Sequence, residues 1–314
     1  MQFAHDFKTR AVAAPDRILV ATDLSDTEFL IPHAIAQAKE SGAELTLLHV
    51  ISPILTGPID PSVIAYVDLP QIKREAGLAI EEAACKIQAR GIKCKTLVKD
   101  GFPSEVILET LRTTGADRLI IGTHGRVHLE RLLLGSVATE LLTKVMVPMC
   151  VIGPKAQERI KHTVPRRILH PVSLRHPNST VIALDIAQHY RAELTLLHVI
   201  DRDETDLGSV NSLINARSRE LAKLIPDSES LWCSIATRVK VGNRAEEILS
   251  MASTMRADLI VLGVSATVPH WPMEGNRTAY KIIATADCPV LTIRHDAYVD
   301  NLRSEKDIAA FILG

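Results

Sequence analysis

The sequence predicts an α/β protein with two tandem copies of one domain, each a five-stranded parallel β-sheet with helices on both faces. Two observations predict this class. Short runs of apolar residues alternate with longer helical patterns, as in parallel sheets whose strands are buried on both sides. Long segments also recur about 145 residues further along the chain.

Two pairs of segments establish the internal repeat. Ala43–Ile51 and Ala192–Ile200 are identical over nine residues, and Val98–Gly122 shares ten of 25 positions with Val239–Gly263. This period is far longer than the roughly 20–50 residues of solenoid repeats. The repeat therefore indicates duplication of a whole domain.

The domain boundaries follow from the repeat and from a change in composition. Between Gly153 and Pro165 the apolar pattern gives way to glycine, proline and charged residues, which is typical of a linker. We therefore expect a first domain over residues 1–155 and a second over residues 165–296. The remaining residues, 297–314, have a helical pattern.

Each element of the first copy is predicted from its local pattern. After the first apolar strand, Ser25-x-x-Glu28 has the pattern of a capping box at the start of a helix. Gly42 marks the end of this helix. A proline in the first turn favours another helix at Pro103. The expected elements are strand 17–21, helix 25–40, strand 45–50, helix 71–89, strand 95–98, helix 103–114, strand 119–121, a helix from about 136 and strand 147–152.

Composition and charge narrow the classes of function. Hydrophobic residues make up 46% of the chain and charged residues 23%, which is typical of a globular protein. The 36 Lys and Arg nearly balance the 37 Asp and Glu, so no overall field favours nucleic acid or an anionic membrane. No apolar run is long enough for a membrane helix, and the five cysteines form no C-x-x-C pair. We expect a cytoplasmic protein.

A glycine-rich turn after the fourth expected strand is the strongest candidate for a binding site. It runs Gly122-Thr-His-Gly125, then nine residues, then Gly135-Ser136 at the start of a helix. Glycines let backbone amides approach a phosphate, and a helix N-terminus adds its partial positive charge. The spacing is neither that of a Walker A loop nor G-x-G-x-x-G. The competing interpretation is a plain strand-end turn at Gly122 and a helix boundary at Gly135.

Single polar residues near this turn have alternative interpretations. Asp23 ends the first expected strand and could accept hydrogen bonds from a ribose. Asp is also a good helix cap, but Ser25 is better placed to cap, which favours ligand contact for Asp23. Arg126 could neutralise phosphate charge or face solvent. His49 recurs in the second copy as His198, which favours a structural role for both.

Taken in order, these segments make the chain resemble the universal stress protein family. The resemblance lies in the spacing of the glycine-rich turn, the opening ILVATDLSDTEFLIPHAIAQAK, the strand LTLLHVI and the segment LLLGSVATELL. It covers residues 17–152 and 167–293, so the chain is similar to a tandem member. The resemblance implies a Rossmann-like fold, of the adenine nucleotide α-hydrolase-like type, in each copy and ATP binding in the first.

The resemblance also implies which residues hold the nucleotide. A divalent cation, Mg²⁺ or Mn²⁺, would bridge the phosphates and keep most of its waters. The implied set, to which we add Arg126, is Ala21, Thr22 and Asp23 against adenine and ribose, Val50 at the adenine edge, Ile121 and Gly122 beside the nucleoside, and Gly125, Gly135, Ser136 and Val137 around the phosphates.

The second copy departs from this pattern. Ser173 stands in the place of Asp23, and Gly263-Val-Ser-Ala266 has lost the second glycine of the turn. Asn276 replaces the serine at the start of the last helix. We therefore expect ATP in the first domain only.

The resemblance implies a nucleotide-dependent regulatory protein of the stress response. No general base is evident near the turn, so we expect at most slow hydrolysis of ATP. A slow ATPase or adenylate-transfer enzyme and a partner-binding module without nucleotide are the alternatives. The resemblance also implies that the last strands, 147–152 and 289–293, pair with each other. The chain would then be an intramolecular pseudo-dimer, and a homodimer of chains stays open.

Overall fold

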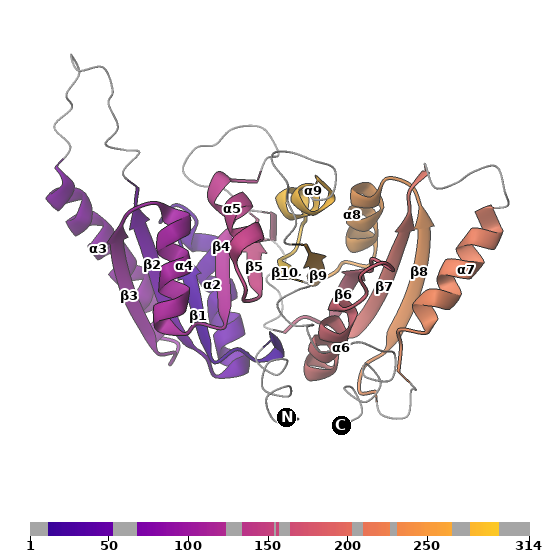
Figure 1. Cartoon of the computed structure of the whole chain (residues 1–314). Coiled ribbons are helices and arrows are strands. Elements are labelled where there is room, and N and C mark those ends of the chain that lie inside the picture. Colours follow the sequence, from indigo (N-terminus) through magenta and orange to yellow (C-terminus); the bar gives the residue numbers. More distant parts are fainter. Residues whose placement is uncertain are drawn as a thin grey trace, which may run out of the picture.

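The chain folds into two similar halves of alternating strands and helices (Figure 1). The computed structural model describes residues 12–52, 68–123, 134–153, 155–156, 164–202, 210–226, 231–265 and 277–294. The first half contains β1 (Arg17–Ala21), α2 (Thr27–Ser41), β2 (Glu44–Ile51), α3 (Leu69–Gln88), β3 (Cys94–Asp100), α4 (Pro103–Thr114), β4 (Arg118–Gly122), α5 (Ser136–Lys144) and β5 (Met149–Ile152). The second half contains β6 (Arg167–Pro171), α6 (Ser179–Tyr190), β7 (Glu193–Ile200), α7 (Val210–Ala222), β8 (Ile235–Val241), α8 (Arg244–Thr254), β9 (Leu259–Val264), α9 (Arg277–Thr285) and β10 (Val290–Arg294). The expected tail over residues 297–314 and most of the expected linker lie outside the described residues.

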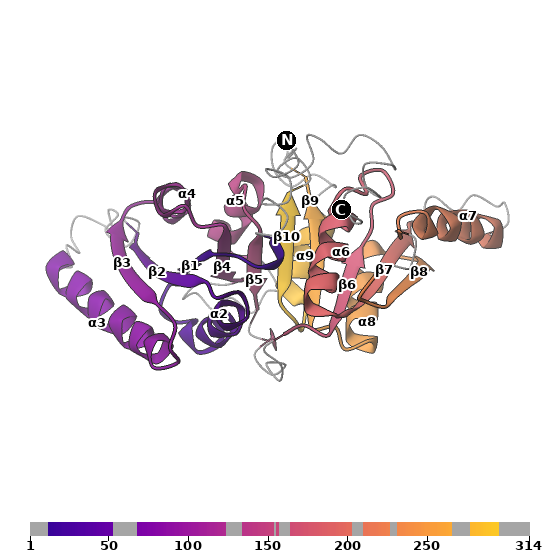
Figure 2. The ribbon, with the colours of Figure 1, turned by 90° about the horizontal axis from the view of Figure 1, so that it is seen from below.

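The strands of both halves form one continuous sheet. Within the described residues its order is β3-β2-β1-β4-β5-β10-β9-β6-β7-β8. Strands are parallel inside each half, whereas β5 and β10 pair antiparallel, with Cys150 opposite Leu291. Seen from below, the sheet twists from β3 at one end to β8 at the other (Figure 2). The predicted fold class, with five parallel strands in each half, is confirmed.

Each face of the sheet carries an apolar core that extends through both halves. Helices α2, α3, α6 and α7 cover one face, where Leu30 and Ile182 pack with strand residues such as Ile120. Helices α4, α5, α8 and α9 cover the other face, where Leu141 and Ile282 are buried. The two halves therefore share their cores as well as their sheet. Among the described residues, no helix is long and apolar enough to cross a bilayer.

The start of helix α2 differs from the sequence prediction. The expected capping box of Ser25 and Glu28 does not form, because α2 begins at Thr27. Asp23 Oδ1 instead accepts hydrogen bonds from the backbone N–H of Ser25 at 2.8 Å and from its hydroxyl at 2.6 Å. The capping prediction was wrong because the Ser25 side chain turns back toward Asp23. The chain makes this turn through Leu24, whose φ of 73° is unusual for a residue other than glycine.

Helix α3 carries the capping bond that α2 lacks. Asp68 Oδ1 accepts a hydrogen bond from the backbone N–H of Gln71 at 2.9 Å, and α3 begins at Leu69, two residues before the predicted start.

We expect Asp68→Ala to lower the free energy of unfolding by about 1 kcal/mol, because one N–H of the first turn loses its acceptor. Ser25→Ala is the control, with an expected change below about 0.5 kcal/mol. Denaturant unfolding of both variants checks this, and equal losses would contradict it.

Candidate functional site

The carboxyl end of the first-half sheet contains the candidate site. From β1 the chain adds β2 and β3 on one side, then crosses over to add β4 and β5 on the other side. Open parallel sheets bind ligands where the strand order reverses in this way, beyond the carboxyl ends of the strands. Here the reversal lies between β1 and β4, which end at Ala21 and Gly122.

The structure brings predicted nucleotide residues together at this edge. Ala21 lies opposite Ile121 in the register of β1 and β4. The backbone N–H of Thr22 donates to the carbonyl of Leu48 in β2 at 3.0 Å. Val50, two residues further along β2, is half-buried. These residues therefore form a continuous edge across three neighbouring strands.

The N-terminus of helix α5 lies next to the end of β4. The backbone N–H of Gly135 donates to the carbonyl of Thr123, which directly follows β4, at 2.9 Å. Ser136, which is exposed, and Val137, which is half-buried, form the first turn of α5. The first-turn N–H groups and the positive end of the helix dipole are thus held beside the switch point. Such a place favours an anion.

Part of the predicted site cannot be placed. Gly125 and Arg126 lie outside the described residues. In the described part of the chain, no group of three or more His, Cys, Asp or Glu residues could hold a metal ion.

Sequence reasoning missed Asp26, the buried acid of this edge. Its side chain is 4% exposed, and its Oδ1 accepts a hydrogen bond from the hydroxyl of Thr22. A Cβ atom added to Gly122 would lie 2.5 Å from Asp26 Oδ2. Gly122 therefore lacks a side chain partly because the carboxyl group of Asp26 fills that space. This contact gives Gly122 a structural role beside its predicted role in binding.

The environment of Asp26 changes its protonation. Burial raises the pKa of Asp26 from an ordinary 3.8 to about 7, the hydrogen bond from Thr22 opposes this, and the negative charge of Asp23 raises the pKa further. Asp26 therefore titrates close to neutral pH. Nothing in the local pattern marked it, because an acid before a helix is an ordinary surface feature.

Comparison with known protein families identifies the family to which the chain belongs. The family model described as the universal stress protein family matches residues 15–153 and again residues 166–294. The chain belongs to the universal stress protein family. The two matches also confirm that it contains two universal stress protein domains in tandem.

Individual universal stress proteins give the same result. A universal stress protein of Mycolicibacterium smegmatis is 23% identical over 288 residues, which cover 88% of this chain and 96% of that protein. MJ0531 of Methanocaldococcus jannaschii, also a universal stress protein, is 32% identical over 145 residues, 45% of this chain and 84% of that protein. The crystal structure of a universal stress protein from Archaeoglobus fulgidus DSM 4304 has a TM-score of 0.67 at 20% identity and covers 90% of this chain and 97% of that one. This structural similarity supports the Rossmann-like fold.

Both universal stress protein domains share the backbone frame at the strand ends. His49 Nδ1 lies 2.9 Å from the carbonyl oxygen of Thr22, and His198 Nδ1 lies 3.0 Å from that of Val172. Each histidine thus ties the residue after the first strand of its domain to the neighbouring strand. These hydrogen bonds are those expected of structural histidines.

The second domain differs from the first in its side chains. The first domain places Thr22, Asp23 and Asp26 after its first strand, and the second places Val172, Ser173 and His176 at the corresponding positions. The described edge of the second domain therefore has neither carboxylate of the first. Ala266 and Asn276, where we predicted further departures, lie outside the described residues.

Proposed function

We propose that the first domain binds ATP and that the protein acts as a nucleotide-dependent regulator in the stress response. The observation that carries this proposal is the N-terminus of α5, which is held beside the end of β4 by the bond from Gly135 to Thr123. Free N–H groups at a helix N-terminus are suited to phosphate. The register of β1 and β4 places Ala21 and Ile121 next to the same point, where a nucleoside would lie.

The proposed contacts follow the predicted set with one refinement. The buried Thr22 hydroxyl donates to Asp26, and its backbone N–H and carbonyl are engaged by Leu48 and His49, so Thr22 would border the nucleotide through packing alone. The adenine and ribose would lie against Ala21, Asp23, Val50, Ile121 and Gly122, and the phosphates against Gly125, Arg126, Gly135, Ser136 and Val137. A bound Mg²⁺ or Mn²⁺ would neutralise phosphate charge while keeping its waters, which suits an edge whose described residues offer no cluster of metal ligands.

The arrangement of the domains supports a proposal about assembly. We propose that the pairing of β5 with β10 makes the chain an intramolecular pseudo-dimer of domains 1–155 and 165–296 in the cytoplasm. A two-fold contact of this kind uses the same surface of each domain. It also covers the free edges of both terminal strands, which would otherwise be open to pairing with other chains.

The ATP proposal predicts a loss of affinity in two variants. Asp23→Ala removes the proposed ribose acceptor, and Gly135→Val adds a branched side chain where the phosphates would meet α5. We expect each to weaken binding of Mg-ATP more than tenfold, measured by isothermal titration calorimetry on the folded variants. Ser173→Ala, at the position of the second domain that corresponds to Asp23, is the matched control and should bind as the unmodified chain does. Unchanged affinity in both first-domain variants would show that the pocket is assigned wrongly.

A further inference from the structure

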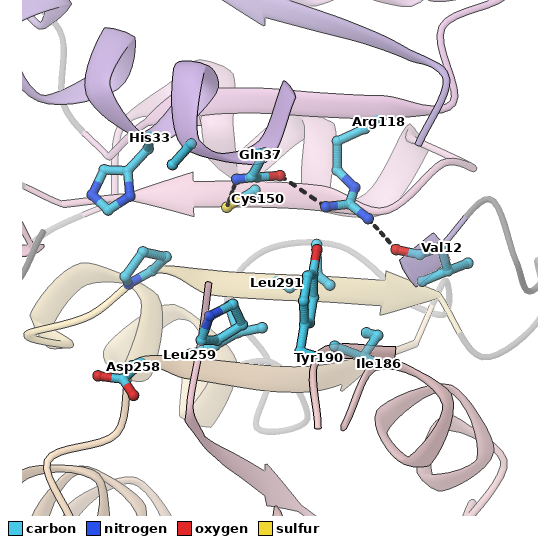
Figure 3. A pocket seen from close by; sticks show the side chains of 13 residues that line it. Val12, His33, Gln37, Arg118, Cys150, Ile186, Tyr190, Asp258, Leu259 and Leu291 are labelled. Atoms are coloured by element: carbon cyan, nitrogen blue, oxygen red, sulfur yellow. Dashed lines mark hydrogen bonds between the residues drawn. The ribbon is translucent and has the colours of Figure 1, made fainter. Parts of the chain in front are cut away.

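A cavity of about 80 Å³ lies between the two domains (Figure 3). Arg118, the first residue of β4, and Leu259, the first residue of β9, are among the residues that line it. The proposed ATP site lies beyond the opposite end of β4, at Gly122. The cavity is therefore separate from the nucleotide site.

The two walls of this interdomain cavity differ in chemistry. Arg118 and Leu259 hold equivalent positions, because Ile18 pairs with Arg118 in the first domain as Ile168 pairs with Leu259 in the second. Beside this aliphatic position the second-domain wall also carries Tyr190 and Asp258. Figure 3 shows His33, Gln37 and Arg118 on the side of the first domain and Ile186, Leu259 and Leu291 on the side of the second.

Arg118 is a buried cation whose hydrogen-bond acceptors are both neutral. It is 4% exposed, one of its terminal nitrogens donates to Gln37 Oε1 at 2.8 Å, and the other donates to the carbonyl of Val12. Its Nε is buried and has no hydrogen-bond partner among the residues that the structure describes. A buried charge that is neither paired nor fully hydrogen-bonded is costly. An anion beside the terminal nitrogens of the guanidinium would supply the opposite charge that the two neutral acceptors do not.

The other titratable groups around the cavity leave this positive charge in place. Burial lowers the pKa of His33 to about 4, so that imidazole is neutral at pH 7. Asp258 accepts hydrogen bonds from the backbone N–H of Arg167 at 2.9 Å and pairs with its guanidinium at 3.5 Å. The Tyr190 hydroxyl donates to the carbonyl of Ala13 at 3.0 Å.

We propose that the interdomain cavity binds a small carboxylate with a short aliphatic chain. The guanidinium of Arg118 binds the carboxylate, since its planar donors match that group. The aliphatic wall of Ile186, Leu259 and Leu291 covers the chain. The cavity of about 80 Å³ is well above the roughly 10–15 Å³ that a single buried water needs, so it has room for a small ligand.

Titration of the full chain with sodium butyrate tests this proposal. Isothermal titration calorimetry at constant ionic strength compares butyrate with butyramide, which has the same shape and no charge, and with sodium sulfate. We expect saturable binding of one butyrate per chain, and at least tenfold weaker binding of both butyramide and sulfate. The absence of saturable butyrate binding, or equal binding of either comparison compound, would overturn the proposal.

Two variants test the two walls separately. Arg118→Met removes the cation, and we expect butyrate affinity to fall at least tenfold. Because Arg118 also bonds to Gln37 and Val12, Ile186→Phe provides a second test that fills the aliphatic wall and leaves the cation in place. It should also lower the affinity at least tenfold, whereas Ser173→Ala should not change it. Unchanged butyrate binding in folded Ile186→Phe or Arg118→Met protein would overturn the assignment.

Discussion

Asp26→Asn is expected to raise the free energy of unfolding at pH 8 by about 4 kcal/mol, because asparagine keeps the acceptor for Thr22 without the buried charge. The carboxyl group of Asp26 has an ordinary pKa of 3.8, and burial raises that pKa to about 7. A raised pKa means that the folded state binds the proton more tightly than the unfolded state does. The contribution of the protonated carboxyl to stability is therefore complete below pH 3.8 and is lost as the pH rises through about 7.

Denaturant unfolding of the unmodified chain and Asp26→Asn between pH 5 and pH 8 measures this effect. The difference in unfolding free energy should grow with pH as Asp26 ionises. Asp185→Asn on α6 is a second test of the same effect, because burial raises the pKa of Asp185 to about 6. That variant should show the same trend with a smaller gain, about 3 kcal/mol. A difference for Asp26→Asn that is the same at pH 5 and pH 8 would contradict the assigned protonation.

Gly122→Ala is expected to destabilise the protein by about 3 kcal/mol and to weaken Mg-ATP binding at least tenfold. The new Cβ would lie 2.5 Å from Asp26 Oδ2 and 3.5 Å from its Cγ. Asp26 is a short, buried side chain held by Thr22, so it cannot move away without losing that bond. Forcing an extra methyl group into such packing costs about 1–3 kcal/mol, and the shift occurs at the point where β4 meets the proposed ribose site.

A double-mutant cycle isolates the steric contact between Gly122 and Asp26. In an Asp26→Ala background the space is open, so Gly122→Ala should cost less than about 1 kcal/mol. The coupling energy between the two positions should then be about 2 kcal/mol. Urea unfolding of the two single variants and the double variant supplies the values. Additive losses would mean that Gly122 is required for a reason other than its contact with Asp26.

The fold could be predicted because the pattern of each element agrees with its environment. A strand such as Leu119–Ile121 is buried on both faces, which only a continuous apolar run satisfies. The Ala43–Ile51 repeat then fixed the number of domains, because nine identical residues return in the same structural context in β7. The predicted helix boundaries were less accurate where a side chain has more than one possible local partner. Ser25, for example, hydrogen-bonds to Asp23 and does not cap α2.

The candidate site was predictable only in outline. Strand ends such as Ala21 and Ile121 follow from the alternation of elements, and the structure places them side by side. The role of Asp26 could not be predicted, because its burial depends on the distant Gly122, which meets it only after β4 has added beside β1. The burial of the Arg118 cation could not be predicted either, because it too depends on residues that are distant in the sequence. Arg118 looks like a charge at the start of a strand until the second domain covers it.

The pairing of β5 with β10 changes how the contact between the domains responds to dilution. Two separate chains that met through these strands would come apart at low concentration, whereas the linker here keeps the partner strand at a fixed local concentration. The contact should thus persist at nanomolar protein. The second domain supplies half of this contact through its sheet. The chain therefore keeps its assembled shape although the strand ends of the second domain have no counterpart of Asp23 and Asp26.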